Sequence, residues 1–516
     1  WGNAKELNER YRNRKDPRQE IILSQNIRIS NDSYQHQRNL HVVVIGGSGS
    51  GKTRFFVKPN ALQCSGSYFF LDPKGELTYS LGGAMEENGV TVTVIDFVHF
   101  RGHYNPVAYL KTDEDAMKLA YALVFNTKKN PAASGGENEF WDKSAVMFLA
   151  SLILYILYES PLYERNLNTM MDMILECKVS EDSYDENRMD ILFGELEQRD
   201  PHHPAVLQYR SFKLGSAKTL SSIMVTAVSN LHMLQSAAFA EMIASDEMFL
   251  PKLGVEKRAI FCVIPDNDDT FNFMVSILYT QLFDQLFRLA DSTPEFHGTL
   301  PVHVRLMMDE FANVATPENF VKILAVARSR NISCDIILQN ISQIKSKYKD
   351  DWETIIGNCD SLVYLGGNDY STFEYISKLL GKQTIRTKGQ SIGKGSHGSS
   401  SDSYQVTGRE LMTPDEVRRM KRSDCLVMIS GEAPVRDKKY NLFDHPNLKY
   451  TPDYRSPRGL LHRFATPIPA PEGYTMPPDY MAQAGTVSLA YVAELTCPEI
   501  TEDLYDELQE WEESLL

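Results

Sequence analysis

The sequence predicts an α/β protein in which a doubly wound, mostly parallel sheet carries an inserted all-α domain. Three observations lead to this prediction. The β-branched run Val42–Ile45 is typical of a buried strand, and it runs directly into a glycine-rich turn. Short apolar runs then alternate with helical patterns along the chain. One long stretch instead shows helical periodicity throughout, broken by prolines. We therefore expect a sheet domain at residues 1–130 and 241–463, a helical insertion at 131–240 and a separate segment at 464–516.

The turn after the first strand has the spacing of a phosphate-binding loop, G-x-x-x-x-G-K-T. Its glycines let the backbone curl so that N–H groups point at phosphate oxygens. Lys52 supplies a charge for the β and γ phosphates, and the Thr53 hydroxyl can bind Mg²⁺. The alternative is a glycine-rich turn that binds nothing. We expect ATP and Mg²⁺ here. ATP is preferred over GTP because the sequence has no Asn-Lys-x-Asp signature for guanine. The residues expected to contact the nucleotide are Gly46, Gly47, Ser48, Gly49, Ser50, Gly51, Lys52 and Thr53.

A second apolar run, 302–308, ends in the consecutive acids Asp309 and Glu310. Ligands of parallel sheets bind at the carboxyl ends of the strands, so we expect both acids to meet Lys52 and Thr53. Asp309 would hold Mg²⁺ through its water shell, and Glu310 would polarise the attacking water. A charged pair that only terminates a strand is the alternative.

The remaining elements complete the alternation. A helical pattern with apolar residues every three or four positions covers 270–290, and a second helix is expected at 320–328. Further strands are predicted at 68–71, 90–95, Arg258–Ile264, 334–338, 362–365 and 425–429.

Two polar side chains beside the strand 334–338 are further site candidates. Gln339 ends this strand, where its amide could contact the γ-phosphate or orient water, or could simply be a hydrophilic strand end. Arg328 precedes the strand together with Arg330. Two arginines in such a place are usually a solvated turn. The sharper hypothesis makes Arg328 an arginine finger that reaches the nucleotide of a neighbouring subunit, so that catalysis requires an oligomer.

Two segments look extrinsic to the sheet domain. Residues 385–405 are rich in Gly and Ser and carry Arg386, Lys388 and Lys394. We expect a polar loop there, either a mobile surface segment or the lining of a nucleic-acid channel. Residues 464–516 begin with a proline-rich linker and end in an acidic, amphipathic helical pattern. That helix could dock on a partner or pack back on its own domain.

Composition narrows the class of protein. The net charge of −15 is concentrated in the tail, because residues 465–516 contain eleven Asp or Glu and no Lys or Arg. The preceding residues carry about −4 and can hold local basic surfaces. Seven scattered cysteines fit neither a disulfide framework nor a zinc site, which favours a reducing compartment. The longest apolar stretch, 146–158, looks too short to span a bilayer, and the charged start is no signal peptide. Because residue 1 is Trp, we expect a part of a longer protein.

Several motifs occur together in an order that is typical of one family. With them, residues 20–450 resemble the TraG-type ATPases, the coupling proteins of type IV secretion and conjugation systems. Besides the glycine-rich loop, the matching segments are Asn39-Leu40-His41, Asp72-Pro73-Lys74-Gly75-Glu76-Leu77, Met308-Asp309-Glu310-Phe311-Ala312, Ala327-Arg328-Ser329-Arg330, Ile337-Leu338-Gln339-Asn340-Ile341-Ser342-Gln343, Leu365-Gly366-Gly367-Asn368-Asp369 and Leu411-Met412-Thr413-Pro414-Asp415-Glu416.

The resemblance implies a RecA-like P-loop NTPase domain with an inserted all-α domain that takes part in substrate recognition. It implies a membrane-anchored hexamer at the cytoplasmic face of the bacterial plasma membrane. Such a hexamer passes relaxase-bound single-stranded DNA or effector proteins to the secretion channel and its ATPases. In related motors a glutamine at the place of Gln339 senses the γ-phosphate, and an arginine near Arg328 acts across the subunit boundary. The sequence departs from the family in two ways. The anchor is absent from this chain, so we expect the chain alone to be a monomer rather than a stable hexamer. The acidic tail is not a motif that the family shares.

The favoured hypothesis is an ATP-hydrolysing motor that couples nucleotide turnover to the transfer of DNA, effector proteins or both. A docking receptor that binds ATP only as a structural ligand is the alternative from another class. The acidic tail, the helical insertion and the negative charge suit it. A double-stranded DNA translocase of the chromosome-segregation type is a further alternative, against which the Asp-Pro-Lys-Gly-Glu and Gly-Gly-Asn-Asp stretches argue.

Overall fold

The computed structural model describes residues 1–454 apart from positions 74, 128–136, 178–186, 266–267, 269, 314–316, 318 and 393–399. The chain divides into two compact units. The sheet unit comprises Trp1–Val98, Phe249–Asp269 and the described residues from Leu282 onward, and the helical unit comprises His99–Met248 and Thr270–Gln281. The six cysteines of the described part are unpaired thiols. The segment expected at 464–516, with Cys497, lies outside the described residues.

A nine-stranded sheet organises the sheet unit, with its strands in the order β13-β12-β9-β3-β8-β7-β4-β6-β5. From β9 to β5 all neighbours are parallel, whereas β12 pairs antiparallel with β9 and β13. Every strand that the sequence predicted is present. The bounds are β3 (Val42–Ile45), β4 (Ser67–Pro73), β5 (Thr91–Asp96), β6 (Arg258–Ile264), β7 (Val304–Met308), β8 (Ile332–Leu338), β9 (Ser361–Tyr364), β12 (Asp424–Ile429) and β13 (Val435–Lys438).

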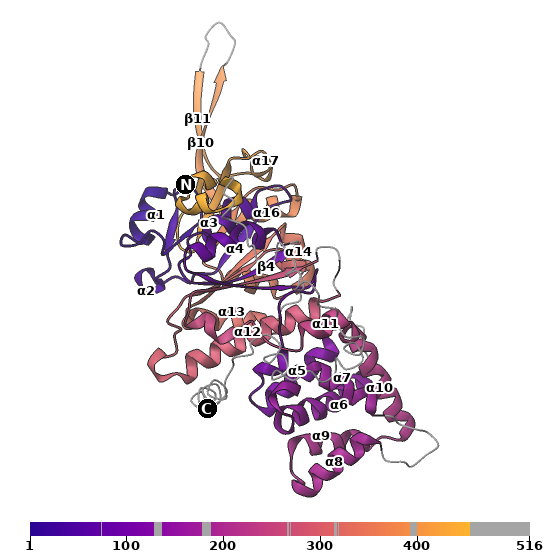
Figure 1. Ribbon diagram of the computed structural model, residues 1–516. Coiled ribbons are helices and arrows are strands. Elements are labelled where there is room, and N and C mark those ends of the chain that lie inside the picture. Colours follow the sequence, from indigo (N-terminus) through magenta and orange to yellow (C-terminus); the bar gives the residue numbers. More distant parts are fainter. Residues whose placement is uncertain are drawn as a thin grey trace. The chain divides into compact units, whose positions relative to one another are not determined.

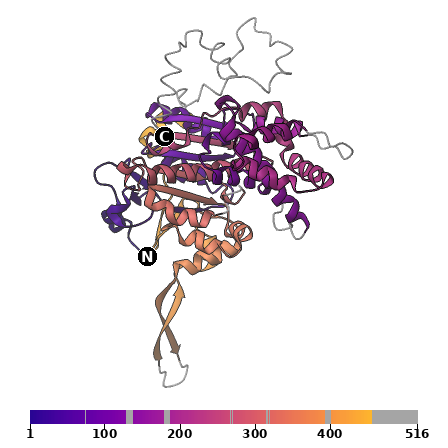
Figure 2. The same ribbon diagram turned by 90° about the horizontal axis from the view of Figure 1, so that it is seen from below.

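Helices cover both faces of this sheet, with α3 and α4 on one face and α13 and the part of α12 from Leu282 onward on the other (Figures 1 and 2). Val42 and Val44 contribute to the core that the first face shares with Phe70. Val43 and Ile45, on the opposite side of the pleat, are fully buried as well. Burial on both faces explains the uninterrupted β-branched run. The helices and their bounds are α1 (Ala4–Tyr11), α2 (Ser33–His36), α3 (Lys58–Ala61), α4 (Glu76–Glu87), α12 (Asn272–Ser292), α13 (Phe320–Ala327), α14 (Ile341–Tyr348), α15 (Trp352–Gly357), α16 (Tyr370–Leu380) and α17 (Pro414–Arg418).

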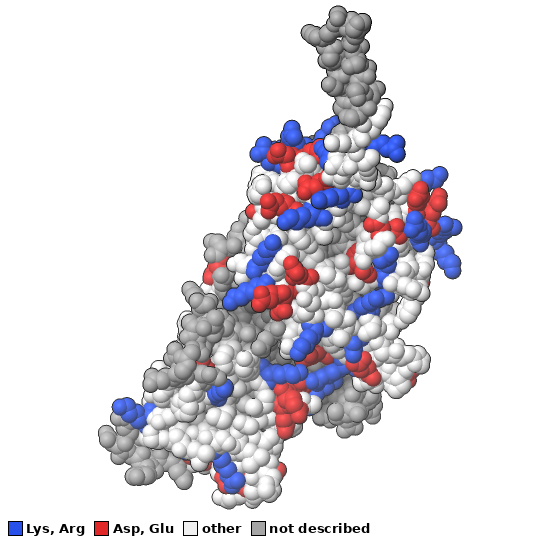
Figure 3. Space-filling model, turned by 180° about the vertical axis from the view of Figure 1, so that it is seen from behind, with Lys and Arg blue, Asp and Glu red and all other residues white. Residues whose placement is uncertain are grey.

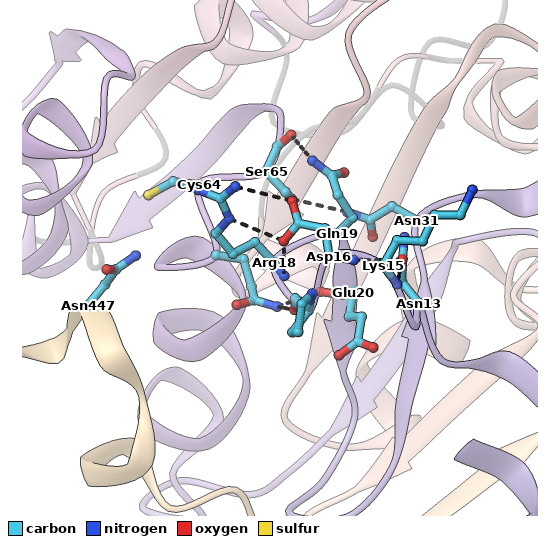
Figure 4. A network of polar contacts seen from close by, with 12 residues as sticks. Asn13, Lys15, Asp16, Arg18, Gln19, Glu20, Asn31, Cys64, Ser65 and Asn447 are labelled. Carbon is cyan, nitrogen blue, oxygen red and sulfur yellow. Dashed lines mark hydrogen bonds and ion pairs between the residues drawn. The ribbon is translucent and has the colours of Figure 1, made fainter. Parts of the chain in front are cut away.

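Within the sheet unit, polar contacts attach the N-terminal segment to the connection between α3 and β4 (Figure 4). It forms the antiparallel pair β1 (Glu20–Ile22) and β2 (Arg28–Ser30). Gln19 Nε2 donates to the Ser65 carbonyl at 3.2 Å, and Asn31 Nδ2 donates to the Ser65 hydroxyl at 3.1 Å. Because residue 65 lies between α3 and β4, these bonds hold the segment against the end of the helix that follows the glycine-rich loop.

The helical unit is built around α6 (Glu137–Glu159), which packs against α5, α7, α9 and α10. By length and composition its stretch Phe140–Glu159 could cross a membrane, but 67% of the 18-residue apolar window within this stretch is buried inside the protein. The expectation of a stretch too short to span a bilayer was based on 146–158, whereas the apolar part of the helix is longer. Packing as a core helix accounts for its apolar character. The other bounds are α5 (Asp113–Phe125), α7 (Leu167–Glu176), α8 (Arg188–Arg199), α9 (Pro204–Lys213), α10 (Ala217–Leu231) and α11 (Ala237–Met242).

The compact helical unit begins at His99, whereas the sequence put the insertion at 131–240. The difference lies mainly in α5, whose buried face packs on α6. Periodicity reveals such a helix but does not say which unit it joins, because that depends on contacts with residues far along the chain.

The described parts of the Gly/Ser-rich segment at 385–405 form a β-ribbon, so the prediction of a loop is wrong for these parts. β10 (Lys382–Ile392) and β11 (Ser400–Glu410) pair antiparallel along their whole length, and the ribbon projects from the sheet unit (Figure 1). β-branched residues recur along both strands and favour extended backbone, a signal that the Gly and Ser content hid. The connection at 393–399, which includes Lys394, lies outside the described residues.

Candidate nucleotide-binding site

The glycine-rich loop after β3 is held by the backbones of two neighbouring strands. The Gly46 N–H donates to the Leu338 carbonyl at 2.9 Å, and the Gly47 N–H donates to the Gly366 carbonyl at 2.9 Å. A Cβ atom on Gly47 would lie 3.0 Å from the Cα of Gly367, so this close approach of two chain segments favours glycine. The position of the loop is therefore fixed by β8 and β9.

The loop leads directly into a helix. Gly51 has a φ of +86°, which favours glycine, and its carbonyl accepts the Phe55 N–H at 2.8 Å. The helix starts with the turn η1 (Thr53–Val57) and continues as α3. Lys52 Nζ folds back over the loop and donates to the Gly46 carbonyl at 3.2 Å. The predicted strand, loop and helix are thus all present.

The acids at the end of β7 and the glutamine at the end of β8 are in direct contact. Gln339 Nε2 donates to Glu310 Oε1 at 3.1 Å, and the Glu310 N–H donates to Asp309 Oδ1 at 3.0 Å. Glu310 has a φ of +53°, a left-handed conformation that costs a non-glycine residue about 1 kcal/mol or more. Such strain is typical of functional sites.

Asp309 lies within electrostatic reach of the loop. Its side chain is buried, and burial raises the pKa of its carboxyl group. The Lys52 ammonium and a hydrogen bond from Thr53 act in the opposite direction and lower this pKa. The structure therefore brings Lys52, Thr53 and Asp309 together, as predicted. A hydroxyl and a carboxylate are hard oxygen ligands, so Thr53 and Asp309 suit Mg²⁺ that keeps waters and phosphates as its other ligands.

These residues line one cleft of about 500 Å³, a volume typical of small-molecule sites. Most of the predicted loop residues line it, together with both acids and Gln339, whereas Gly46, Ser48 and Ser50 do not. The lining residues are Gly47, Gly49, Gly51, Lys52, Thr53, Asp72, Pro73, Glu76, Leu77, Asp309, Glu310 and Gln339.

Asp72 is a cleft residue to which the sequence reasoning gave no role. Its carboxylate accepts the Leu77 N–H at 3.0 Å and both the N–H and the hydroxyl of Thr78 at 2.6 Å, which caps α4. Burial raises the pKa of Asp72 to about 6, and the charge of Asp309 adds to this rise. Asp72 lies near the carboxyl end of β4, which pairs with β7. The rule that selected Asp309 could therefore have selected Asp72.

Arg328 does not line the cleft of its own chain. It precedes β8, whereas Gln339 follows it, and a strand of 7 residues spans about 20 Å. The Arg328 guanidinium donates to the Gln37 carbonyl at 3.1 Å. Its neighbour Arg330 pairs with Asp291 at 2.8 Å. A role for Arg328 in catalysis would therefore have to be exerted on another subunit.

Comparison with known proteins identifies relatives of this chain. The profile of the family described as "Type IV secretory system Conjugative DNA transfer" matches residues 1–469. The conjugal transfer protein TraG of Rhizobium radiobacter is 23% identical over 413 residues, covering 77% of this chain and 61% of TraG. Protein VirD4 of the same organism is 23% identical, covering 79% of this chain and 58% of VirD4. The chain thus spans about three fifths of the length of these two relatives.

A solved structure shares the fold. The structure described as plasmid coupling protein TrwB in complex with ADP and Mg²⁺ matches with a TM-score of 0.56 and 16% identity, covering 86% of this chain and 93% of TrwB. This likeness confirms the predicted fold class, a RecA-like P-loop NTPase sheet with an inserted helical domain. The matches to TraG and VirD4 confirm the resemblance that the sequence motifs indicated.

Proposed function

The chain belongs to the type IV secretory system conjugative DNA transfer family, and we propose that it is the family's ATP-hydrolysing coupling protein. In this function it delivers relaxase-bound single-stranded DNA, effector proteins or both to the secretion channel. One observation carries the proposal: the loop with Lys52 and Thr53 shares a single cleft with Asp309, Glu310 and Gln339. That TrwB is described with bound ADP and Mg²⁺ supports these ligands for this chain as well.

The cleft residues divide the work of hydrolysis among them. The loop N–H groups and Lys52 bind the phosphates, while Thr53 and Asp309 hold Mg²⁺. Mg²⁺ supplies charge neutralisation on the phosphate oxygens when it is bound. Glu310 orients the attacking water and accepts its proton. Gln339, through its 3.1 Å bond to Glu310, holds this carboxylate in position and links it to the γ-phosphate end of the cleft.

The proposal includes assembly as a hexamer at the cytoplasmic face of the plasma membrane, in contact with other type IV secretion ATPases and channel components. The position of Arg328 is an argument for an oligomer. It lies at the amino end of β8, opposite the cleft of its own chain, so only the nucleotide of a neighbouring subunit is available to it. An arginine that acts across a subunit boundary stabilises the charge that develops in phosphoryl transfer.

The β10–β11 ribbon supports single-stranded DNA as one substrate. On the face of the sheet unit shown in Figure 3, basic and acidic side chains are interspersed, so that face presents no field of one sign. The ribbon differs. Arg386 pairs with Val406 and Lys388 pairs with Tyr404 in its register, which puts these four exposed side chains on the same ribbon face. Cationic groups beside an aromatic ring can bind phosphates and stack on bases at the same time.

The DNA contact can be tested by anisotropy of a labelled single strand over a range of salt concentrations. We expect Arg386→Ala combined with Lys388→Ala to weaken binding. The slope of log affinity against log salt should fall by about 1.4, since each phosphate contact contributes about 0.7. The control is Gln383→Ala combined with Thr407→Ala, on the opposite ribbon face. Equal affinities for both double variants would remove the ribbon from the DNA path.

ATP turnover and transfer test the proposed function itself. We expect the full-length protein to hydrolyse ATP, and Lys52→Ala to abolish both ATP binding and transfer of a mobilisable plasmid in the host. The docking-receptor alternative predicts ATP binding without turnover, in the absence and presence of single-stranded DNA. Transfer at the wild-type frequency by Lys52→Ala would contradict the motor.

A further inference from the structure

The chain after β13 returns to the phosphate-binding loop. Lys439 Nζ donates to the Ser50 carbonyl at 2.9 Å and lies 5.2 Å from the centre of the Phe55 ring. The Lys439 side chain is buried, and burial lowers its pKa. A buried ammonium group needs a partner, and here the partner is a backbone carbonyl of the loop. The segment 439–443 is therefore attached directly to the loop.

This segment presents an exposed aromatic ring on a fixed support. Phe443 belongs to the short turn η10 (Leu442–Asp444) and is 59% exposed, whereas its neighbour Leu442 is buried. The Asn441 side chain accepts the Phe443 N–H at 3.3 Å, and the Asn441 N–H donates to Gln25 Oε1 at 2.7 Å. The exposed ring thus stands on a backbone that the Asn441 side chain caps and that Gln25 anchors.

The ring of Phe443 lies beside Arg54, the residue that directly follows the loop. The Arg54 guanidinium carbon is 5.6 Å from the ring centre, within the range of a cation–π contact. Both side chains are exposed. Two planar groups therefore stand in solvent at the first turn of the helix that follows the loop.

The order of the strands indicates which end of a nucleotide reaches these groups. Glu310 and Gln339, which mark the γ-phosphate end, follow β7 and β8 on one side of β3. β9, β12 and β13 lie on the other side of β3, and Phe443 follows β13. The loop N–H groups hold the α and β phosphates. A nucleotide whose γ-phosphate faces β7 therefore extends its ribose and base towards the β13 side.

We propose that Arg54 and Phe443 form a stacking platform for the nucleobase, and that Lys439 positions this platform relative to the phosphate-binding loop. The inference rests on the proposed function, because it requires a nucleotide at the loop. Bases stack on aromatic rings and on guanidinium planes, and such stacking is tolerant of base identity. The site would therefore distinguish a nucleotide from a bare polyphosphate without strong preference among bases.

The test compares a ligand with a base and a ligand without one. Calorimetry with the full chain measures the affinities for Mg²⁺-ADP and Mg²⁺-pyrophosphate. We expect Phe443→Ala to weaken ADP binding by roughly tenfold or more and to leave pyrophosphate binding within about twofold of wild type. Phe443→Trp should retain ADP binding. A matched control is Phe249→Ala, because Phe249 is also exposed and lies 5.7 Å from a guanidinium, that of Arg258, but at the amino end of β6.

The outcomes separate this inference from the proposed function. If Phe443→Ala weakens both ligands equally, the ring supports the loop and binds no base, which overturns the platform. Unchanged affinity for ADP overturns it as well. If the wild-type chain binds neither ligand, the proposed function fails first, and the platform fails with it.

Discussion

Replacing Glu310 with Gln should separate nucleotide binding from hydrolysis. The substitution keeps the side chain's shape and leaves an oxygen that can still accept the Gln339 Nε2–H now found at 3.1 Å. It removes the negative charge that would accept a proton from the attacking water. We therefore expect Glu310→Gln to bind ATP and Mg²⁺ and to fail in turnover.

The expected magnitudes differ enough to be told apart. Loss of a general base reduces the rate by about 10²–10⁴-fold, which corresponds to about 3–5 kcal/mol on the barrier. The hydrogen bond from Gln339 changes from a charge-assisted to a neutral one, a loss of about 1 kcal/mol. The left-handed backbone at Glu310 is equally strained in both proteins. The folded state should therefore lose about 1 kcal/mol at most, far less than the rate effect.

Single-turnover hydrolysis with enzyme in excess over labelled ATP, together with calorimetric binding, measures both quantities. Glu76→Gln is the matched control, because Glu76 is an acid that lines the same cleft from α4 rather than from the end of β7. We expect this control to retain turnover within about threefold of wild type. Turnover of Glu310→Gln within the same limit, with ATP bound, would refute the assignment. An equal loss in both variants would point to the charge of the cleft rather than to a base.

Three further predictions concern pH, assembly and stability. Metal ligation needs an ionised carboxylate, and burial raises the pKa of Asp309. As the pH is lowered, the Mg²⁺-dependent affinity for nucleotide should therefore begin to fall at a higher pH than it would with an aspartate of ordinary pKa. A pH series of binding measurements tests this, and Asp309→Asn should make the affinity less dependent on pH. Arg328→Ala should bind nucleotide but turn it over poorly in the assembled protein. Mixing it with Lys52→Ala subunits should restore part of the ATPase activity, because a Lys52→Ala subunit still supplies Arg328 to its neighbour. A role of Arg328 within its own subunit would not allow this recovery. Arg305→Met should lower the free energy of unfolding in urea titrations by about 3–5 kcal/mol, because it leaves buried Asp335 without the ion pair now at 2.6 Å. A loss under about 1 kcal/mol would contradict this. Adding Asp335→Leu should recover most of the lost stability.

The sheet and the two acids at the end of β7 were predictable because both leave local signals. A parallel strand buried on two faces needs consecutive apolar, often β-branched residues, as in Val42–Ile45, and acids that follow such a strand stand out. β13 was missed because its burial pattern, with a single buried residue among four, is that of a polar edge strand. The ribbon of β10 and β11 was missed because its register is set by cross-strand pairing, while its composition resembles a loop.

The surroundings of the loop could not be read from the sequence, because they depend on contacts over long distances in the chain. Lys439 meets Ser50 from a position 389 residues away, and neither residue type marks the encounter. Arg54 was passed over because the loop pattern ends at Thr53. The position of Arg328 at the far end of β8 needed only the strand's direction and agrees with the cross-subunit hypothesis, which remains a prediction.

The two backbone bonds that fix Gly46 and Gly47 to the strands beside β3 have a thermodynamic consequence. Confining one residue's backbone costs about 1–2 kcal/mol, and folding of the sheet meets that cost before any ligand arrives. The binding entropy obtained by calorimetry should accordingly lack the large penalty of a segment that orders around its ligand. Deuterium uptake at these two amides should be slow in the ligand-free chain. A loop of this kind can bind and release phosphate ligands one after another without losing its order in between.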